Sequence, residues 1–228
     1  MNPPNQIAQL AAEIRARLSA LPSPGPPEIR AVRREFSRRI HTAQPEFVLQ
    51  LALHLLQPNP ETLRYFAYEL VANHRAAFAQ LNLNDLLRLG IGLNSWFSVD
   101  CFAIYLSGPM WAQGNLSTET IAQWAQSEDR WWRRAALVST VAPSRRGTPS
   151  DLANALQICS QLAPDRDDMV VKALSWALRE VAKKHPEAAT SFLTQHHQTL
   201  PARVTREVTN KLTTGLKTRR KSHPSQSS

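Results

Sequence analysis

Four segments of the chain resemble one another at a nearly constant spacing, which constrains the fold more than any other feature. They read TLRYFAYELVAN from Thr62, WFSVDCFAIYLS from Trp96, WWRRAALVSTVA from Trp131 and MVVKALSWALRE from Met169, at offsets of 34, 35 and 38 residues. This period is typical of a solenoid of helix pairs, in which every second helix lines one curved surface. Chance similarity among amphipathic helices is the alternative, but the connecting segments are also short and helical. We therefore expect Asp100, Arg134 and Trp176 to face a common groove.

The rest of the sequence also predicts an all-α fold. Strand-like alternation is nearly absent, only 7 of 228 residues are glycine, and prolines cluster where helices begin. We expect one domain at 1–217 and a basic, disordered tail at 218–228. The expected helices are Asn5–Leu21, Pro27–His41, Pro45–Gln57, Pro60–His74, Leu83–Leu93, Ser95–Leu106, Thr118–Ser127, Asp129–Val141, Pro149–Leu162, Asp167–His185, Pro186–His197 and Pro201–Lys217.

Several protein classes lack support in the sequence. No stretch approaches about twenty uninterrupted apolar residues, and the polar start MNPPNQIAQL does not have the pattern of a signal peptide. Cys101 and Cys159 are the two cysteines, and neither belongs to a CxxC or Cys/His pattern. We therefore expect a soluble protein in a reducing compartment, with no membrane contact, disulfide framework or metal site.

Positive charge favours a polyanionic partner, nucleic acid first and anionic membrane second. Lys and Arg number 27 against 18 Asp and Glu, which gives a net charge of +9. Arg30, Arg34 and Arg38 repeat every fourth residue, so on a helix they form a ridge that can follow a phosphate backbone. Further clusters are Arg145–Arg146 and residues 201–228. A solvated face with snorkelling arginine stems is the alternative for each cluster, but the three together favour nucleic acid.

Asp100 interrupts the apolar helical segment SWFSVDCFAIYL at Ser95–Leu106. An unpaired carboxylate is costly to bury, so its face of the helix either looks at solvent or forms a site. Trp96 lies one helical turn earlier on the same face, which makes indole and carboxylate neighbours. A pure DNA-binding module would gain from losing Asp100, because repulsion from a phosphate at about 4 Å costs on the order of 1 to 4 kcal/mol.

A carboxylate at such a position suits a reaction that develops positive charge. Cleavage of an N-glycosidic bond passes through a transition state that resembles an oxocarbenium ion. An N-alkylated purine is already cationic and leaves without being protonated, so one carboxylate that stabilises the sugar cation and holds a water is enough. Trp96 and Trp176 can add cation–π stabilisation. Glycine-rich phosphate loops and metal-ligand spacings of histidine are absent, so no cofactor is expected.

Four motifs in order resemble the DNA alkylation repair glycosylases of the AlkD type. They are GPPEIRAVRREFSR at Gly25–Arg38, WFSVD at Trp96–Asp100, WWRRAAL at Trp131–Leu137 and KALSWALRE at Lys172–Glu180. The similarity runs from about Gly25 to Lys217. It implies a right-handed α-solenoid of HEAT-like helix pairs with a concave basic groove. It also implies excision of 3-methyladenine and 7-methylguanine from double-stranded DNA without base flipping.

The same resemblance implies roles for individual residues. Asp100 matches the catalytic aspartate, and Trp96 matches the aromatic residue one turn before it. Arg134 is similar to an arginine that holds a DNA phosphate, while Trp176 and Arg179 resemble the second groove tryptophan and its neighbouring arginine. We add Arg30 from the α-helical ridge to the expected DNA-binding residues.

Two departures from the family pattern leave alternative functions open. RARLSALPSP precedes the first motif where the family has Tyr, Phe and Lys, and the arginine-rich tail is not a family feature. We expect a monofunctional DNA-alkylpurine N-glycosylase, a monomer in the cytoplasm that associates with the nucleoid when bound to DNA. One alternative is a non-catalytic HEAT-repeat protein that binds DNA structures. Another is a helical-repeat scaffold for an acidic partner protein.

Overall fold

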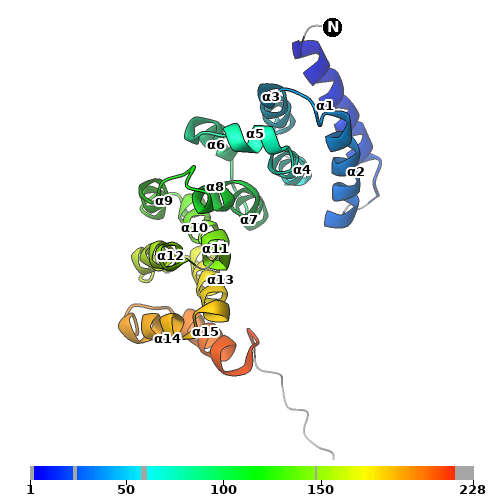
Figure 1. Ribbon diagram of the computed structural model, residues 1–228. Coiled ribbons are helices and arrows are strands. Elements are labelled where there is room, and N and C mark those ends of the chain that lie inside the picture. Colours follow the sequence, from blue (N-terminus) through cyan, green and yellow to red (C-terminus); the bar gives the residue numbers. More distant parts are fainter. Residues whose placement is uncertain (1–2, 23–24, 58–60, 147, 219–228) are drawn as a thin grey trace, which may run out of the picture. The chain divides into compact units, whose positions relative to one another are not determined.

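The computed structural model describes residues 3–22, 25–57, 61–146 and 148–218, and all regular structure in these ranges is helical (Figure 1). Contacts divide the chain into two compact units, Met1–Ser117 and Thr118–Ser228. The all-α class predicted from the sequence is confirmed. The expectation of a single domain at 1–217 stays a prediction, and residues 219–228 of the expected tail lie outside the described residues.

The first unit is built around one helix that is buried along most of its length. α4 (Glu61–Ala72) packs against α2, α3, α5, α7 and η1, and every residue from Leu63 to Val71 is buried. A helix that is covered on all sides is the centre of its unit. The elements of this unit are α1 (Pro3–Ser19), α2 (Pro26–Arg39), α3 (Pro45–Leu55), α4, α5 (Arg75–Gln80), α6 (Leu83–Gly90), α7 (Trp96–Phe102), η1 (Ala103–Ser107) and α8 (Gly108–Ala112).

A buried arginine on α4 satisfies the end of α6. Arg64 donates hydrogen bonds to the hydroxyl of Tyr68 at 2.6 Å, to the carbonyl of Leu89 at 3.4 Å and to that of Ile91 at 2.5 Å. The last carbonyls of a helix lack intrahelical donors, so they need such partners when they are buried. This contact fixes the chain just before it enters α7.

The second unit has α13 as its central helix. α13 (Asp168–Lys184) packs against α10 on one side and α15 on the other, and also contacts α11, α12 and α14. Its buried residues recur three and four positions apart, which is the pattern of an amphipathic helix. The other elements are α9 (Thr118–Ala125), α10 (Arg130–Ser139), α11 (Val141–Arg146), α12 (Pro149–Gln161), α14 (Pro186–Gln195) and α15 (Ala202–Thr214).

Side-chain caps set the start of the three helices that carry most of the candidate site residues. Ser95 caps α7, where its hydroxyl accepts from the backbone N–H of Ser98 at 3.2 Å and the Ser98 hydroxyl accepts from Ser95 N–H. Asp129 and Asp167 cap α10 and α13, where their carboxylates accept from the backbone N–H groups of Trp131 and Met169. Each cap occupies one of the orphan donors of the first turn, so these helix starts are encoded locally.

The helix expected at Ser95–Leu106 is present, but it is not a single regular α-helix. It is regular only to Phe102 and continues as the π-helical segment η1, where Gly108 N–H donates to the carbonyl of Ala103 five residues earlier. Pro109 has no N–H, so the Tyr105 carbonyl lacks its α-helical donor, which disfavours a regular helix here. The other expected helices form with slightly different ends, and three short helices, α5, α8 and α11, were not expected.

Candidate functional site

The first part of the site is the outward face of α7. Trp96 is 55% exposed and Asp100 is half-buried, while Ser98, Val99 and their neighbours Cys101 and Phe102 on the other face are buried. The hydroxyl of Ser95 also donates to the carboxylate of Glu61 at the start of α4, which holds the beginning of α7 against the core. The face of α7 that carries Asp100 therefore lies at the boundary with solvent, and Asp100 is one turn from the exposed Trp96 indole.

Aromatic rings continue from Trp96 into the unit. Trp96 packs edge-on against Phe97 with ring centroids 5.9 Å apart, and Phe97 stacks on Tyr65 of α4 at 5.9 Å. Tyr105 of η1 packs edge-on against Tyr65 at 5.8 Å, and the two hydroxyls are 3.5 Å apart. The π-helical segment therefore brings a tyrosine hydroxyl into a row of rings that begins beside the candidate catalytic residue.

Arg30 is held by this same cluster. Its Nε donates to Glu69 Oε1 at 2.8 Å, its Nη2 donates to the Tyr105 hydroxyl at 3.0 Å, and its guanidinium lies 5.8 Å from the centre of the Tyr65 ring. Arg33, one turn later on α2, also donates to Glu69 at 3.4 Å. Arg30 keeps 43% of its side chain exposed. The residue expected to bind DNA is thus a cation whose position the protein itself fixes.

Glu69 remains charged although it is buried. Burial by itself raises the pKa of this carboxyl, but hydrogen bonds from Arg30, Tyr65 and Tyr105 outweigh burial and lower the pKa overall. Burial, with the hydrogen-bonded Tyr105 and the charge of Glu69, also raises the pKa of Tyr65. The cluster of Arg30, Arg33 and Glu69 therefore carries a net charge of +1 when all three are ionised.

Asp100 acts electrostatically on the neighbouring thiol. Burial, together with the negative charges of Asp100, Glu69 and Glu61, raises the pKa of Cys101 to about 12, against a smaller opposite effect of Arg30. The thiol is therefore protonated at neutral pH and unsuited to act as a nucleophile.

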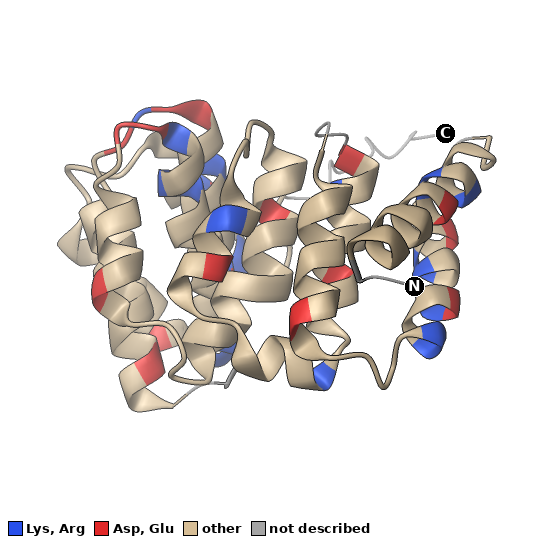
Figure 2. Cartoon of the chain, turned by 90° about the horizontal axis from the view of Figure 1, so that it is seen from above, with Lys and Arg blue, Asp and Glu red and all other residues tan. Residues whose placement is uncertain are grey.

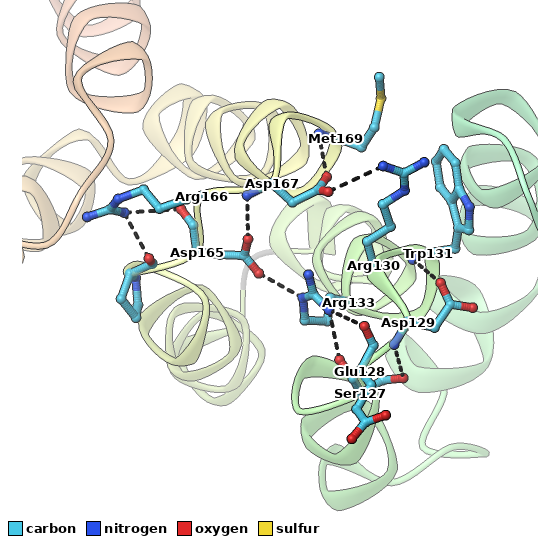
Figure 3. Close-up of polar contacts among 11 residues, drawn as sticks. Ser127, Glu128, Asp129, Arg130, Trp131, Arg133, Asp165, Arg166, Asp167 and Met169 are labelled. Atoms are coloured by element: carbon cyan, nitrogen blue, oxygen red, sulfur yellow. Dashed lines mark hydrogen bonds and ion pairs between the residues drawn. The ribbon is translucent and has the colours of Figure 1, made fainter.

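In the second unit, the WWRRAAL segment forms the first turns of α10 (Figure 3). Arg130 lies over the Trp131 ring at 4.9 Å, and Trp132 packs on Trp124 of α9 with centroids 4.8 Å apart. Arg133 forms an ion pair with Asp165 at 2.8 Å and donates to the Glu128 carbonyl. These contacts tie the start of α10 to the segment before α13.

Arg134 is much less exposed than a phosphate-binding side chain on an open surface would be. Only 5% of the residue is exposed, and its Nη1 donates to the carbonyl of Met169 in the first turn of α13 at 2.5 Å. Its guanidinium is therefore fixed between α10 and α13. The structure places Arg134 at the junction of two helices, and its role toward DNA stays a prediction.

Trp176 and Arg179 lie on α13, each half-buried and each oriented by a glutamate. The Trp176 indole donates to Glu180 at 3.3 Å, and Glu180 also accepts from Arg145 at 3.2 Å and from Lys183 at 2.6 Å. Arg179 donates to Ser175 and lies 4.0 Å from Glu207, and burial lowers its pKa. Burial by itself raises the pKa of Glu180, but hydrogen bonds from Lys183 and Arg145 outweigh it.

Glu69 and Glu180 were not predicted from the sequence, although Glu69, like Asp100, lies in a largely apolar helical segment. Each glutamate holds two cations and an aromatic side chain. Figure 2 shows acidic residues interspersed with basic ones along the helices. Local sequence did not reveal these pairs, because the arginine partners come from other helices.

Among the described residues, no three His, Cys, Asp or Glu side chains are grouped so that they could hold a metal ion. No helix in the described ranges is both long enough and apolar enough to cross a membrane. The prediction that Asp100, Arg134 and Trp176 face a common groove stays a prediction.

Comparisons with known proteins agree with the fold and cover most of the chain. Two solved structures are similar: one described as a predicted DNA alkylation repair enzyme from Enterococcus faecalis, with a TM-score of 0.69 and 19% identity over 92% of this chain and 96% of that one, and AlkD2 from Streptococcus mutans, with a TM-score of 0.68 and 18% identity over 92% and 99%. They confirm the predicted all-α, HEAT-like fold. No curated protein matches. The profile described as DNA alkylation repair enzyme matches residues 25–212, and the chain therefore belongs to this family.

Proposed function

We propose that the protein is a DNA glycosylase that excises cationic N-alkylated purines, such as 3-methyladenine and 7-methylguanine, from double-stranded DNA. The observation that carries the proposal is the pair on α7, a half-buried Asp100 one turn from the exposed Trp96. Membership of a DNA alkylation repair family supports DNA as the partner. An acid beside an exposed indole is suited to a reaction centre that becomes positively charged.

In the proposed reaction the bond between C1′ of the deoxyribose and the purine nitrogen breaks, and both electrons leave with the base. The base was cationic, so it departs as a neutral methylated purine and needs no general acid. The Asp100 carboxylate stabilises the positive charge that develops on the sugar. Water then adds to C1′, and its proton passes to the carboxylate or to solvent.

The remaining candidate residues hold the DNA in this proposal. Trp96 contacts the lesion region, and its indole face favours a nearby cation. Arg30, Arg134, Trp176 and Arg179 contact the backbone and the groove. The protein works as a monomer, without a cofactor and without flipping the damaged base into a pocket.

The experiment that tests this proposal measures free methylated bases released from methylated duplex DNA by the wild-type protein, by Asp100→Asn and by a no-enzyme control. Electrostatic stabilisation of this kind is worth on the order of 100- to 1000-fold in rate, so Asp100→Asn is expected to lose about this much while it still binds DNA. The control corrects for spontaneous depurination. Release by Asp100→Asn at the wild-type rate would remove Asp100 from the mechanism.

A second candidate function is a DNA-structure-binding protein without useful turnover. It is favoured because two arginines that were expected to contact DNA form hydrogen bonds inside the protein. Arg30 donates to Glu69 and Tyr105, and Arg134 donates to the carbonyl of Met169. If wild-type release equals the no-enzyme control while the protein binds DNA, this second function is the correct one. Weak DNA binding at moderate salt together with tight binding to an acidic protein would instead identify a scaffold.

A further inference from the structure

The outer face of α2 carries a pocket that is lined by basic side chains. Arg33, Arg34, Ser37 and Arg38 recur three and four residues apart on this helix, and His41 follows in the next loop. Together they line a pocket of about 590 Å³, and its lining among the described residues includes no carboxylate. A concave surface with several cations and no acid attracts an anion.

Arg34 and Arg38 differ from the other arginines of α2 because they form no ion pair within the described part of the chain. Arg30 and Arg33 bind Glu69, and Arg39 forms an ion pair with Glu13 of α1. Arg34 and Arg38 are exposed, and their side chains have no ion pair or hydrogen bond within the described part of the chain. They lie four residues apart, so their charges repel each other, and an anion between them would relieve this repulsion.

The helix dipole explains only part of this arrangement. A positive charge in the last turn of a helix is favourable, and Arg38 lies there. Arg34 lies one turn earlier, where the dipole offers little. The two together are suited to a ligand that carries more than one negative charge along the helix axis.

The position of the pocket relates it to the candidate catalytic helix within the first unit. Arg30, at the other end of the same face, contacts Tyr105 directly after α7. From Arg30 to Arg38 the helix rises about 12 Å at about 1.5 Å per residue. Each DNA strand carries one phosphate per about 3.4 Å of axis, so this distance corresponds to about three to four nucleotides.

We propose that Arg34, Arg38 and His41 bind phosphates of the DNA backbone. This inference rests on the proposed function insofar as the ligand is DNA, but it does not require catalysis. DNA is favoured over an anionic membrane because the cations follow one helix in a narrow row. It is favoured over an acidic protein because the family acts in DNA repair.

The test compares Arg34→Ala/Arg38→Ala with Arg75→Ala/Arg166→Ala. Arg75 and Arg166 are exposed, have no ion pair in the described ranges and lie outside the three basic clusters, so the control removes the same charge elsewhere. Binding of undamaged duplex DNA is followed by fluorescence anisotropy at several salt concentrations. Each lost phosphate contact lowers the slope of log K against log salt by about 0.9, so the α2 variant is expected to lower it by about 1 to 2.

Equal slopes for the α2 variant and wild type, or an equal decrease for both double variants, would overturn the α2 site. Arg34→Lys/Arg38→Lys retains the charges and is expected to keep most of the slope, and thermal melting verifies that all variants are folded. Binding of the same variants to phosphatidylserine vesicles is measured in parallel. If the α2 substitutions reduce binding to these vesicles but not to DNA, the pocket is a membrane contact and the proposal is wrong.

Base release separates this inference from the proposed function. At enzyme concentrations below saturation, Arg34→Ala/Arg38→Ala is expected to release methylated bases more slowly than wild type, because less of the DNA is bound. Asp100→Asn is expected to keep the wild-type salt slope while it loses release. If the wild type releases no base but the slope still depends on Arg34 and Arg38, the α2 site stands and the glycosylase does not.

Discussion

Arg30 Nε on α2 donates to Glu69 Oε1 on α4 at 2.8 Å, so a predicted DNA contact is also part of the internal structure of its unit. Only 4% of the Glu69 side chain is exposed, and it has Arg33 as a second arginine partner. Moving Arg30 away to reach a phosphate would leave a buried carboxylate with fewer donors, which is costly. We therefore expect Arg30 to stay in place and to offer DNA a fixed positive charge.

Replacing Glu69 with Gln is expected to destabilise the protein by about 1 to 3 kcal/mol, because hydrogen bonds to a buried charged group are lost while both arginines stay positive. Urea denaturation measures the change. Glu28→Gln serves as the control, because Glu28 is exposed on α2 and has no ion pair in the described ranges. A stability loss no larger than that of the control would show that Glu69 does not organise this cluster.

The same carboxylate makes stability depend on pH. The pKa of Glu69 in the folded protein is below its ordinary value of 4.5, so the unfolded chain binds the proton more readily. The contribution of Glu69 to the free energy of unfolding is complete above pH 4.5. It is lost as the pH falls through the lower pKa that Glu69 has in the folded protein. Urea denaturation from pH 6 to pH 3 is therefore expected to show a steeper loss for wild type than for Glu69→Gln. Parallel curves would contradict this prediction.

Trp96→Ala is expected to reduce base release without reducing stability. The side chain is 55% exposed, so the fold loses little buried area. A cation–π contact is worth about 0.5 to 2 kcal/mol, which corresponds to a decrease of about 2- to 30-fold in single-turnover rate. Trp96→Phe retains an aromatic face, so its single-turnover rate should lie between those of wild type and Trp96→Ala. If Trp96→Ala released bases at the wild-type rate, the indole would have no part in the reaction.

Arg134→Ala is expected to change both stability and DNA binding. The Nη1 contact to the Met169 carbonyl is largely buried, and its loss should cost about 1 to 3 kcal/mol in the free energy of unfolding. If Arg134 also holds a phosphate, the salt slope of DNA binding falls by about 0.9. A folded Arg134→Ala protein with the wild-type slope would assign this arginine to the fold alone.

Both cysteines are expected to resist alkylation in the native state. Burial raises the pKa of Cys101 and of Cys159 to about 12. At pH 8 about one thiol in 10,000 is therefore ionised, and the thiolate is the reactive form. Mass spectrometry after iodoacetamide treatment should show no modification of the folded protein and two modifications in urea. Fast labelling of the native protein would mean that one of these helices opens readily.

The helices of the repeat were predictable because their signals are local. Ser95, Asp129 and Asp167 cap their helices through contacts within the first turn, and apolar residues at helical spacing identify the buried faces. The π-helical segment after Phe102 was not expected, although Pro109 was a visible cause. A missing donor predicts that regular helix is disfavoured, but not which irregular form replaces it.

Sequence by itself determined the all-α class, the helical repeat and the place of Asp100 one turn from Trp96, because spacing along a single helix fixes these relations. Tertiary structure alone decided which charges are available for a ligand. Arg30, Arg34 and Arg38 are equivalent in the sequence, yet Arg30 is held by Glu69 and Tyr105 while Arg34 and Arg38 remain exposed. The partners of Arg30 come from α4 and η1 and lie 39 and 75 residues further along the chain. A local sequence pattern cannot predict contacts at such separations.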